Sequence, residues 1–391
     1  MKRALVLLVF LTGAAVWAGA QAPDSLDRNR SKYATYHFEK DDQYQVENPY
    51  DPVEVRQPTG KTIKNVIFLI GDGMGFEQVN VGWVANGGKL NMTDRMPVLG
   101  ASRTYCTDQL ITDSCAGGTA LAIGQKTKYG YIGIDENAQP VESNLQWAKR
   151  VKGMKTGVTV TCRINDATPA DFCVHGPSRK DEEGLAAQYV DANVDFISGG
   201  GTHFWNQRSD GRNLIEEMKA KGYTWVEKLA DVPAAKGDKY LGLFEEYDMS
   251  PALDRGPVLL ETTKKAIELL DNEKGFFLMI EGSQIDDYAH RRKVGQMCEE
   301  LFDFDKTLGY VLEWAAKDGQ TLVVVTADHC TGGLTLLKGS LEERTVQVHF
   351  STKGHDGIMV PVFAFGPGAQ HFAGIHENAE IGQIVRKLLE N

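Results

Sequence analysis

Cysteine is scarce in this 391-residue sequence, and its placement excludes several classes of protein. No two cysteines form a CxxC pair, and no Cys/His spacing typical of a zinc finger occurs. No cysteine precedes Cys106, so we expect no lipid-anchored amino terminus of the bacterial lipobox kind. In an exported chain the six thiols allow up to three disulfides, and we predict a Cys162–Cys173 pair first because these two flank one short segment. The cysteines are Cys106, Cys115, Cys162, Cys173, Cys298 and Cys330.

Long hydrophobic runs are also lacking beyond the amino terminus. Residues 1–20 combine Lys2 and Arg3 with an apolar run and end in small residues, which predicts a secretory signal peptide too short to span a membrane. No other stretch approaches about 18 consecutive apolar residues, so we predict no membrane span. The mature protein is therefore expected to be periplasmic or secreted.

An excess of basic residues is absent as well. The net charge of −11 becomes −13 when Lys2 and Arg3 leave with the signal peptide, because residues 1–20 contain no acidic residue. Such acidity argues against a nucleic-acid-binding surface. It would also repel anionic substrates unless cations gather locally at the binding site.

What is present is a repeated alternation of apolar runs, polar loops and helical patterns. Because unalternating apolar runs are typical of strands buried on both faces, we predict an α/β fold with a doubly wound, largely parallel sheet and helices on both of its faces. The expected strands are 65–70, 156–161, 194–197, 276–280, 321–325 and 360–365, and the expected helices are 182–193, 209–221, 257–271 and 293–317. Residues 21–60 are expected to be an irregular lead-in, 61–391 a single domain, and 202–256 a surface insertion around one or two helices.

Polar residues that are able to bind metal follow several of these strands. In open α/β sheets ligands bind outside the carboxyl ends of the strands. Any one such residue could be a surface or capping residue, but several at equivalent places in one sheet favour a functional site. They are Asp72, Thr168, Glu281, Asp328 and His329.

A serine follows an aspartate within LITDSCAGGTAL (110–121), where a helix is expected to begin. At a helix start, Ser114 would lie near unpaired backbone N–H groups that favour an anion. The small residues after it leave room for a substrate or metal ions. The alternative is that Asp113 or Ser114 only caps the helix.

Histidines at two other places have spacings that suit metal binding. Asp286 and His290 are four residues apart, so on a helix they point from one face as two ligands of one zinc ion. Asp328 and His329 could serve a second zinc ion together with Asp72. His355 lies between glycines just before the strand 360–365, so it would have to fold back over the rim of the sheet.

Taken together, these motifs resemble the alkaline phosphatase family. The likeness runs in order from about Asn65 to Pro367, which is most of the mature chain. The motifs that carry it are GDGMG (71–75), TDSCA (112–116), DATP (166–169), EGSQID (281–286) with His290, TADH (326–329) and GHDG (354–357).

The resemblance implies a site with two zinc ions and one magnesium ion. It assigns Asp286, His290 and His355 to the first zinc ion. It places Asp72, Asp328, His329 and the phosphorylatable Ser114 around the second. Asp72 would also bind magnesium, together with Thr168 and Glu281. Arg179 stands where the family has the arginine that grips phosphate.

The expected activity is hydrolysis of phosphate monoesters, with broad specificity, through a phosphoserine intermediate on Ser114 and with an alkaline pH optimum. The alternatives are a phosphodiesterase or sulfatase of the same superfamily, or a non-catalytic phosphate- or metal-binding protein. The resemblance also implies a homodimer, although no stretch of the sequence identifies an interface. Three residues depart from the well-known bacterial pattern: Cys115 replaces an alanine, Asp287 a lysine and Thr331 a histidine.

Overall fold

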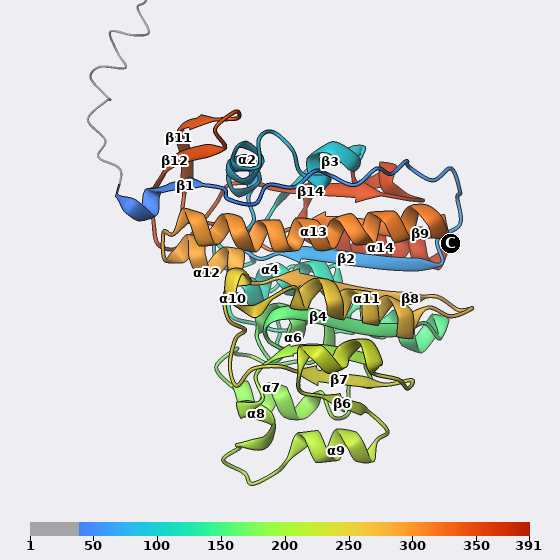
Figure 1. Ribbon diagram of the computed structural model, residues 1–391. Helices are drawn as coiled ribbons and strands as arrows, with labels where there is room; N and C mark the ends of the chain where they lie inside the picture. Colours follow the sequence, from blue (N-terminus) through green and yellow to red (C-terminus); the bar gives the residue numbers. More distant parts are fainter. Residues whose placement is uncertain (1–38) are drawn as a thin grey trace, which may run out of the picture. The chain divides into compact units, whose positions relative to one another are not determined.

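A ten-stranded sheet organises residues 39–391, the part of the chain that this computed structural model describes (Figure 1). The predicted signal peptide and residues 21–38 of the predicted lead-in lie outside the described residues. The strand order is β15-β3-β14-β9-β2-β8-β4-β5-β7-β6. These strands are β2 (Asn65–Gly71), β3 (Val98–Arg103), β4 (Lys155–Arg163), β5 (Phe196–Gly200), β6 (Thr224–Val226), β7 (Tyr240–Leu243), β8 (Phe276–Gly282), β9 (Thr321–Thr326), β14 (Val360–Phe365) and β15 (Gly374–Glu377).

The strand β2 shows why the apolar runs are continuous. It pairs in parallel with β8 on one side and β9 on the other. Ile67 and Leu69 belong to one buried apolar cluster, whereas Val66, Phe68 and Ile70 belong to a second one. Because successive side chains alternate between the two faces of a sheet, both faces of β2 are covered, and every position from Val66 to Ile70 is apolar.

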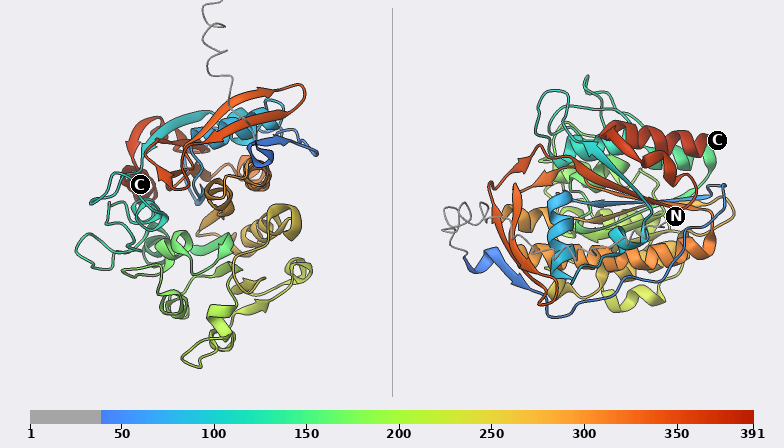
Figure 2. Two further views of the ribbon diagram at one scale, coloured as in Figure 1. Left: turned by 90° about the vertical axis from the view of Figure 1, so that its left-hand side faces the viewer. Right: turned by 90° about the horizontal axis from the view of Figure 1, so that it is seen from above.

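Helices cover the two faces, which confirms the doubly wound prediction (Figure 2). One face packs against α2 (Phe76–Ala85), α11 (Val258–Leu270) and α13 (Val294–Asp318). The other packs against α4 (Ser114–Ile123), α6 (Ala167–Cys173) and α14 (Asn378–Glu390). The predicted helices 257–271 and 293–317 match α11 and α13 closely, while 182–193 and 209–221 shorten to α7 (Glu182–Gln188) and α9 (Leu214–Ala220).

One strand, β14, runs against the others. It pairs antiparallel with both β3 and β9, and the remaining pairs of the sheet are parallel. The residues before β14 therefore lie at the same edge as the carboxyl ends of the parallel strands. The expectation that His355 must fold back over the rim was wrong, because the reversed strand brings His355 to that edge directly. There β13 (His355–Asp356) pairs with β10 (Cys330–Thr331).

The segment 202–256 contributes more than the surface helices that we expected. Its strand β7 pairs in parallel with β5, and β6 pairs in parallel with β7. The segment thus extends the main sheet by two short strands. It also contains α8 (His203–Asn206), α9 and α10 (Ala252–Arg255). A separate three-stranded sheet is formed by β1 (Gln43–Gln45), β11 (Leu334–Ser340) and β12 (Thr345–Phe350).

All six cysteines are free and buried, so the predicted Cys162–Cys173 disulfide is wrong. The Sγ atom of Cys162 lies 3.6 Å from a carboxylate oxygen of Glu281. Cys173 instead ends α6, and its sulfur lies beside Tyr189. The two thiols therefore have different neighbours although they flank one segment.

Within residues 39–391, no helix is both long and apolar enough to cross a membrane.

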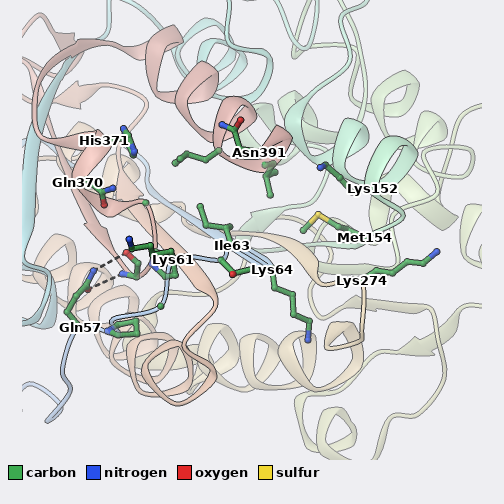
Figure 3. A pocket seen from close by; sticks show the side chains of 18 residues that line it. Gln57, Lys61, Ile63, Lys64, Lys152, Met154, Lys274, Gln370, His371 and Asn391 are labelled. Carbon is green, nitrogen blue, oxygen red and sulfur yellow. Dashed lines mark hydrogen bonds between the residues drawn. The ribbon is translucent and has the colours of Figure 1, made fainter.

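A hollow of about 960 Å³ opens at the amino-terminal edge of the sheet, opposite the predicted ligands (Figure 3). Its lining includes Lys61, Lys64, Lys152 and Lys274. Lys152 ends one helix, and Lys64 lies 3.4 Å from Asp271, which follows the end of α11. Cations at helix carboxyl ends offset the partial negative charge there. Lys64 and Lys152 therefore have a structural explanation.

Candidate active site

The helix α4 begins at Ser114, as predicted. Asp113 caps it, since its carboxylate accepts a hydrogen bond of 3.1 Å from the backbone N–H of Ala116. The cap is thus Asp113, and the hydroxyl of Ser114 is left to face His329, whose Nε2 lies 3.1 Å from Oγ. Ser114 is buried at the positive end of the helix dipole, where an anion is favoured.

The first group of metal-binding side chains consists of Asp286, His290 and His355. Asp286 and His290 come from α12 (Gln284–His290), and Nε2 of His290 lies 3.0 Å from the Asp286 carboxylate. His355 approaches the other Asp286 oxygen to 3.8 Å. The Nδ1 atoms of both histidines are hydrogen-bonded to backbone carbonyls, of Lys353 and Thr112 respectively. These bonds turn both Nε2 atoms toward one point, as in zinc sites.

The second group consists of Asp72, Asp328 and His329. His329 is fully buried, and its Nε2 lies 3.1 Å from Asp328 and 3.4 Å from Asp72. The backbone N–H of Gly73 donates to Asp328 over 3.1 Å. Within each group, the possible ligand atoms all lie within 4.8 Å of one another. The geometry therefore assembles the same two trios that the sequence predicted.

The two groups are in contact. The rings of His329 and His355 stack with their centroids 3.5 Å apart. The hydroxyl of Thr331 donates to Asp286 in the first group and lies 3.2 Å from Nδ1 of His329 in the second. Gly73 sits between the groups with φ +67°, and a Cβ there would come within 2.7 Å of the Asp286 carboxylate. The second glycine of GDGMG thus allows both groups to approach each other.

Thr168 and Glu281 belong to neither group, but their chemistry fits a further cation. Thr168 lies in the first turn of α6, and Glu281 lies near the end of β8. The buried oxygen atoms that have no hydrogen-bond partner among the described residues include Oγ1 of Thr168, Oδ1 of Asp72 and Oδ2 of Asp328. Unpaired buried oxygens are costly, and hydroxyl and carboxylate oxygens are ligands that suit magnesium.

Ionising the carboxylates of the site costs free energy when no cations are present. Burial, followed by repulsion from Asp166, raises the pKa of Glu281 to about 8. Burial and the charge of Asp286 raise the pKa of Asp328 to about 6. Burial and the charge of Asp328 raise the pKa of Asp72 well above its usual range. Burial also acts on Asp286, but the hydrogen bond from His290 and the nearby histidines lower its pKa below the usual value. Such a site is completed by positive charge.

Arg179 lies just before α7 and forms an ion pair with Asp166. The charge of Asp166 raises the pKa of Arg179 further above its usual range, and Asp72 contributes in the same direction. Burial opposes ionisation of Asp166, but Arg179 and Arg163 hold its pKa below the usual value. The side chain of Arg179 is 38% exposed, so it is not closed off from a ligand.

Comparison with known proteins decides the family. The family model for alkaline phosphatase matches residues 63–345. Alkaline phosphatase 4 of Bacillus subtilis (strain 168) is 34% identical, over 84% of this chain and 89% of that relative.

The chain belongs to the alkaline phosphatase family. The structure of alkaline phosphatase from the Antarctic bacterium TAB5 matches it with a TM-score of 0.80 and 35% identity, over 84% of this chain and 99% of that one. Alkaline phosphatase of Escherichia coli (strain K12) is 29% identical over 84% of this chain and 86% of the relative. The protein is a phosphoric monoester hydrolase and, as a member of this family, metal-dependent.

The three departures from the bacterial pattern occupy different surroundings. Cys115 is buried inside α4, and Thr331 joins the two ligand groups as described. Asp287 is 41% exposed and lies 3.9 Å from Arg291. Burial and the charge of Asp286 raise the pKa of Asp287, and Asp248 and Asp166 add to the rise. Asp287 therefore lies where the charges of other carboxylates act on it, and it does not point wholly into solvent.

Sequence reasoning offered Asp113 as one of two possible caps, but it missed the roles of Gly73 and Arg163. The preference of aspartate for the residue before a helix was a usable signal for Asp113. The glycine motif marked a tight turn at Gly73, but not the neighbours of that turn. No local pattern pointed to Arg163, whose partners come from three separate segments.

The carboxylates predict how the stability of the metal-free protein depends on pH. Unfolded Glu281 has an ordinary pKa near 4.3, and the folded value is about 8. At a pH between these two values, the folded protein keeps a proton on Glu281 that the unfolded chain has lost. His290, whose pKa is raised to about 9 chiefly by its hydrogen bond to Asp286, acts in the same direction. Stability contributed by such groups is lost as pH rises through the folded pKa.

We therefore expect the Tm of the chelated protein to fall between about pH 7 and about pH 9. His329, whose pKa is lowered by burial, is neutral in both states above about pH 7 and does not oppose the fall. The zinc- and magnesium-loaded protein, scanned in the same buffers, is the control for groups elsewhere. A chelated protein with the same Tm and pH profile as the loaded one would contradict this account of the site.

Proposed function

We propose that Ser114 is the nucleophile of a broadly specific phosphate monoesterase and forms a phosphoserine intermediate. The observation that carries this proposal is the position of its hydroxyl, 3.1 Å from His329 at the amino terminus of α4 and beside two contiguous groups of metal-binding side chains. A helix start favours the charge that gathers on a bound phosphate. No other described serine is proposed for this role.

The donor sets fit two zinc ions and one magnesium ion. Asp286, His290 and His355 would hold one zinc ion, and Asp72, Asp328, His329 and Ser114 would surround the other. Asp72 and Thr168 would hold magnesium through their unpaired oxygens, together with the carboxylate of Glu281. A variant of the TAB5 enzyme is described with magnesium bound in its M3 site. When bound, the cations favour the alkoxide form of serine and stabilise the attacking and leaving oxygens.

The reaction follows from the positions of the protein's own groups. Oγ of Ser114 attacks phosphorus as the bond to the leaving alcohol breaks, and the Ser114 proton is lost to solvent. Water then attacks the phosphoserine, which releases inorganic phosphate and restores the hydroxyl. Arg179 offers a planar pair of N–H donors for two phosphate oxygens, and Asp166 holds it in place.

The charge balance explains how an acidic protein binds a dianion. Four site carboxylates carry −4 when ionised, and three divalent cations carry +6, which leaves the pocket positive. The carboxylates are Asp72, Glu281, Asp286 and Asp328.

We also propose that the protein is exported, periplasmic or secreted, and acts as a homodimer on small phosphate monoesters. The signal-like composition of residues 1–20 supports export, and the acidic net charge argues against nucleic acid as a partner. A sulfatase or phosphodiesterase is not favoured, because the relatives are named phosphatases and Arg179 suits a terminal phosphate.

Changing Ser114 to alanine tests the nucleophile. We expect the variant to lose the phosphoenzyme and to hydrolyse p-nitrophenyl phosphate more slowly by orders of magnitude. A residual rate should survive because Arg179 and the cations can still orient water. Acid quenching with labelled phosphate locates the modified residue, and label on a residue other than Ser114 would refute the assignment. The bis-ester and sulfate analogues, assayed in parallel, should be much poorer substrates.

The pH profile of the reaction is the next prediction. Both steps need a deprotonated oxygen nucleophile, so kcat of the metal-loaded protein should climb from neutral to alkaline pH. Steady-state rates at saturating substrate measure it. An optimum near about pH 5 would be inconsistent with this chemistry.

Asp287 provides a prediction about product release. A lysine here would replace a negative charge beside the ligand residue Asp286 with a positive one and strengthen binding of the phosphate product. We expect Asp287→Lys to lower the inhibition constant of inorganic phosphate by up to about tenfold, because partial exposure weakens the effect of the charge. Turnover at saturating substrate should fall if product release limits it.

The matched control is Asp287→Asn, which removes the charge without reversing it and should shift the inhibition constant by a smaller factor in the same direction. An inhibition constant that is unchanged in both variants would show that the side chain of Asp287 does not act on bound phosphate.

A further inference from the structure

Arg163 is the centre of a charge cluster that the reaction described above does not use. Its side chain is 18% exposed and forms ion pairs with three carboxylates, one of them three residues along the chain and two from distant segments. Nε contacts Glu182 at 2.9 Å, Nη2 contacts Asp166 at 3.2 Å, and Nη1 contacts both oxygens of Asp248 at 2.9 and 3.0 Å. All three nitrogens of the side chain are therefore engaged.

One oxygen connects this cluster to the phosphate-binding arginine. Oδ1 of Asp166 is shared by Nη2 of Arg163 and Nη2 of Arg179. The backbone N–H of Asp166 also donates to the carbonyl of Arg163 over 2.9 Å. Arg163 therefore restrains Asp166 through both its backbone and its side chain, and the position of Asp166 decides where Arg179 can lie.

A second connection reaches Arg179 through the backbone. Glu182 begins α7, and Arg179 lies in the turn just before that helix. By binding Glu182, Arg163 holds the start of α7, while Asp166 holds the side chain of Arg179. The guanidinium of Arg179 is thus located from two directions by groups that Arg163 orders.

The third partner gives the segment 202–256 a role. Asp248 follows β7, and both of its carboxylate oxygens accept from Nη1 of Arg163, while Oδ1 also accepts the backbone N–H of Arg163 over 2.9 Å. One carboxylate is therefore tied to both the backbone and the side chain of Arg163, which restrains the guanidinium. The two edge strands therefore present a carboxylate that orients Arg163.

We propose that Arg163, oriented by Asp248, is a positioning residue that sets the phosphate affinity of the site through Asp166 and Arg179. This inference rests on the proposed role of Arg179 in binding phosphate. It goes further because it assigns an effect on phosphate affinity to a second arginine, which does not itself contact the substrate. A planar guanidinium is required at this position, because an ammonium group cannot hold three carboxylates in the same fixed geometry.

The test is a double-mutant cycle on the zinc- and magnesium-loaded protein, with the inhibition constant of inorganic phosphate, kcat, KM and Tm as readouts. The variants are Arg163→Met, Arg163→Lys, Asp248→Asn, Arg179→Ala and the double variant Arg163→Met/Arg179→Ala. We expect Arg163→Met to raise the inhibition constant and KM by about tenfold, since residues in one hydrogen-bond network are strongly coupled. The same change in the Arg179→Ala background should add little.

The matched control is Arg255→Met. Arg255 also forms ion pairs with two carboxylates, Glu300 and Asp303, and its side chain is 1% exposed. This control should lower Tm without changing the inhibition constant, whereas a change in that constant is the signature of positioning. Arg163→Lys keeps the charge and should fold even if Arg163→Met does not. It and Asp248→Asn should each raise the inhibition constant by a smaller factor than Arg163→Met.

The outcomes separate this inference from the proposed function. If Arg179→Ala weakens phosphate binding but Arg163→Lys and Asp248→Asn leave it unchanged, the positioning role is overturned and the role of Arg179 stands. Independent, multiplicative effects of Arg163→Met and Arg179→Ala would also overturn it. If Arg179→Ala itself leaves phosphate binding unchanged, both the proposed role of Arg179 and this inference fail.

Discussion

The buried carboxylates at the carboxyl edge of the sheet impose the constraint on which the rest of the site depends. Asp72, Glu281 and Asp328 are held close together in an interior that raises their pKa values. Like charges in such a place are tolerated only when they are protonated or paired with cations. The surrounding structure serves this arrangement, because the parallel strands deliver the acids and the helix α4 delivers Ser114 at the end that favours an anion.

Contact between the two ligand groups follows from a few small features. Gly73 leaves no side chain where the groups meet, and Thr331 bridges Asp286 and His329 with one hydroxyl. The reversed direction of β14 then sets His355 against His329. Where the bacterial pattern has a histidine, this chain thus has a threonine that links the two groups by hydrogen bonds. This difference is the clearest local departure of the site from the bacterial pattern.

Much of this arrangement could be predicted from the sequence, for identifiable reasons. The apolar runs marked the central strands, and the polar residues after them marked the carboxyl edge, so Asp72, Asp328 and His329 were expected together. The spacing of Asp286 and His290 was enough to place both on one helix face. The direction of β14 could not be predicted, because an apolar run reads the same in either direction. The strands β6 and β7 are short, and the partners of Arg163 are brought together only by the tertiary fold.

Anomalous diffraction from crystals of the metal-loaded protein, recorded at the zinc absorption edge, tests the central claim most directly. The account predicts two zinc peaks, one among Asp286, His290 and His355 and one among Asp72, Asp328 and His329. It also predicts that Oγ of Ser114 faces the second peak. The absence of zinc from both trios in crystals grown with zinc and magnesium would contradict the account.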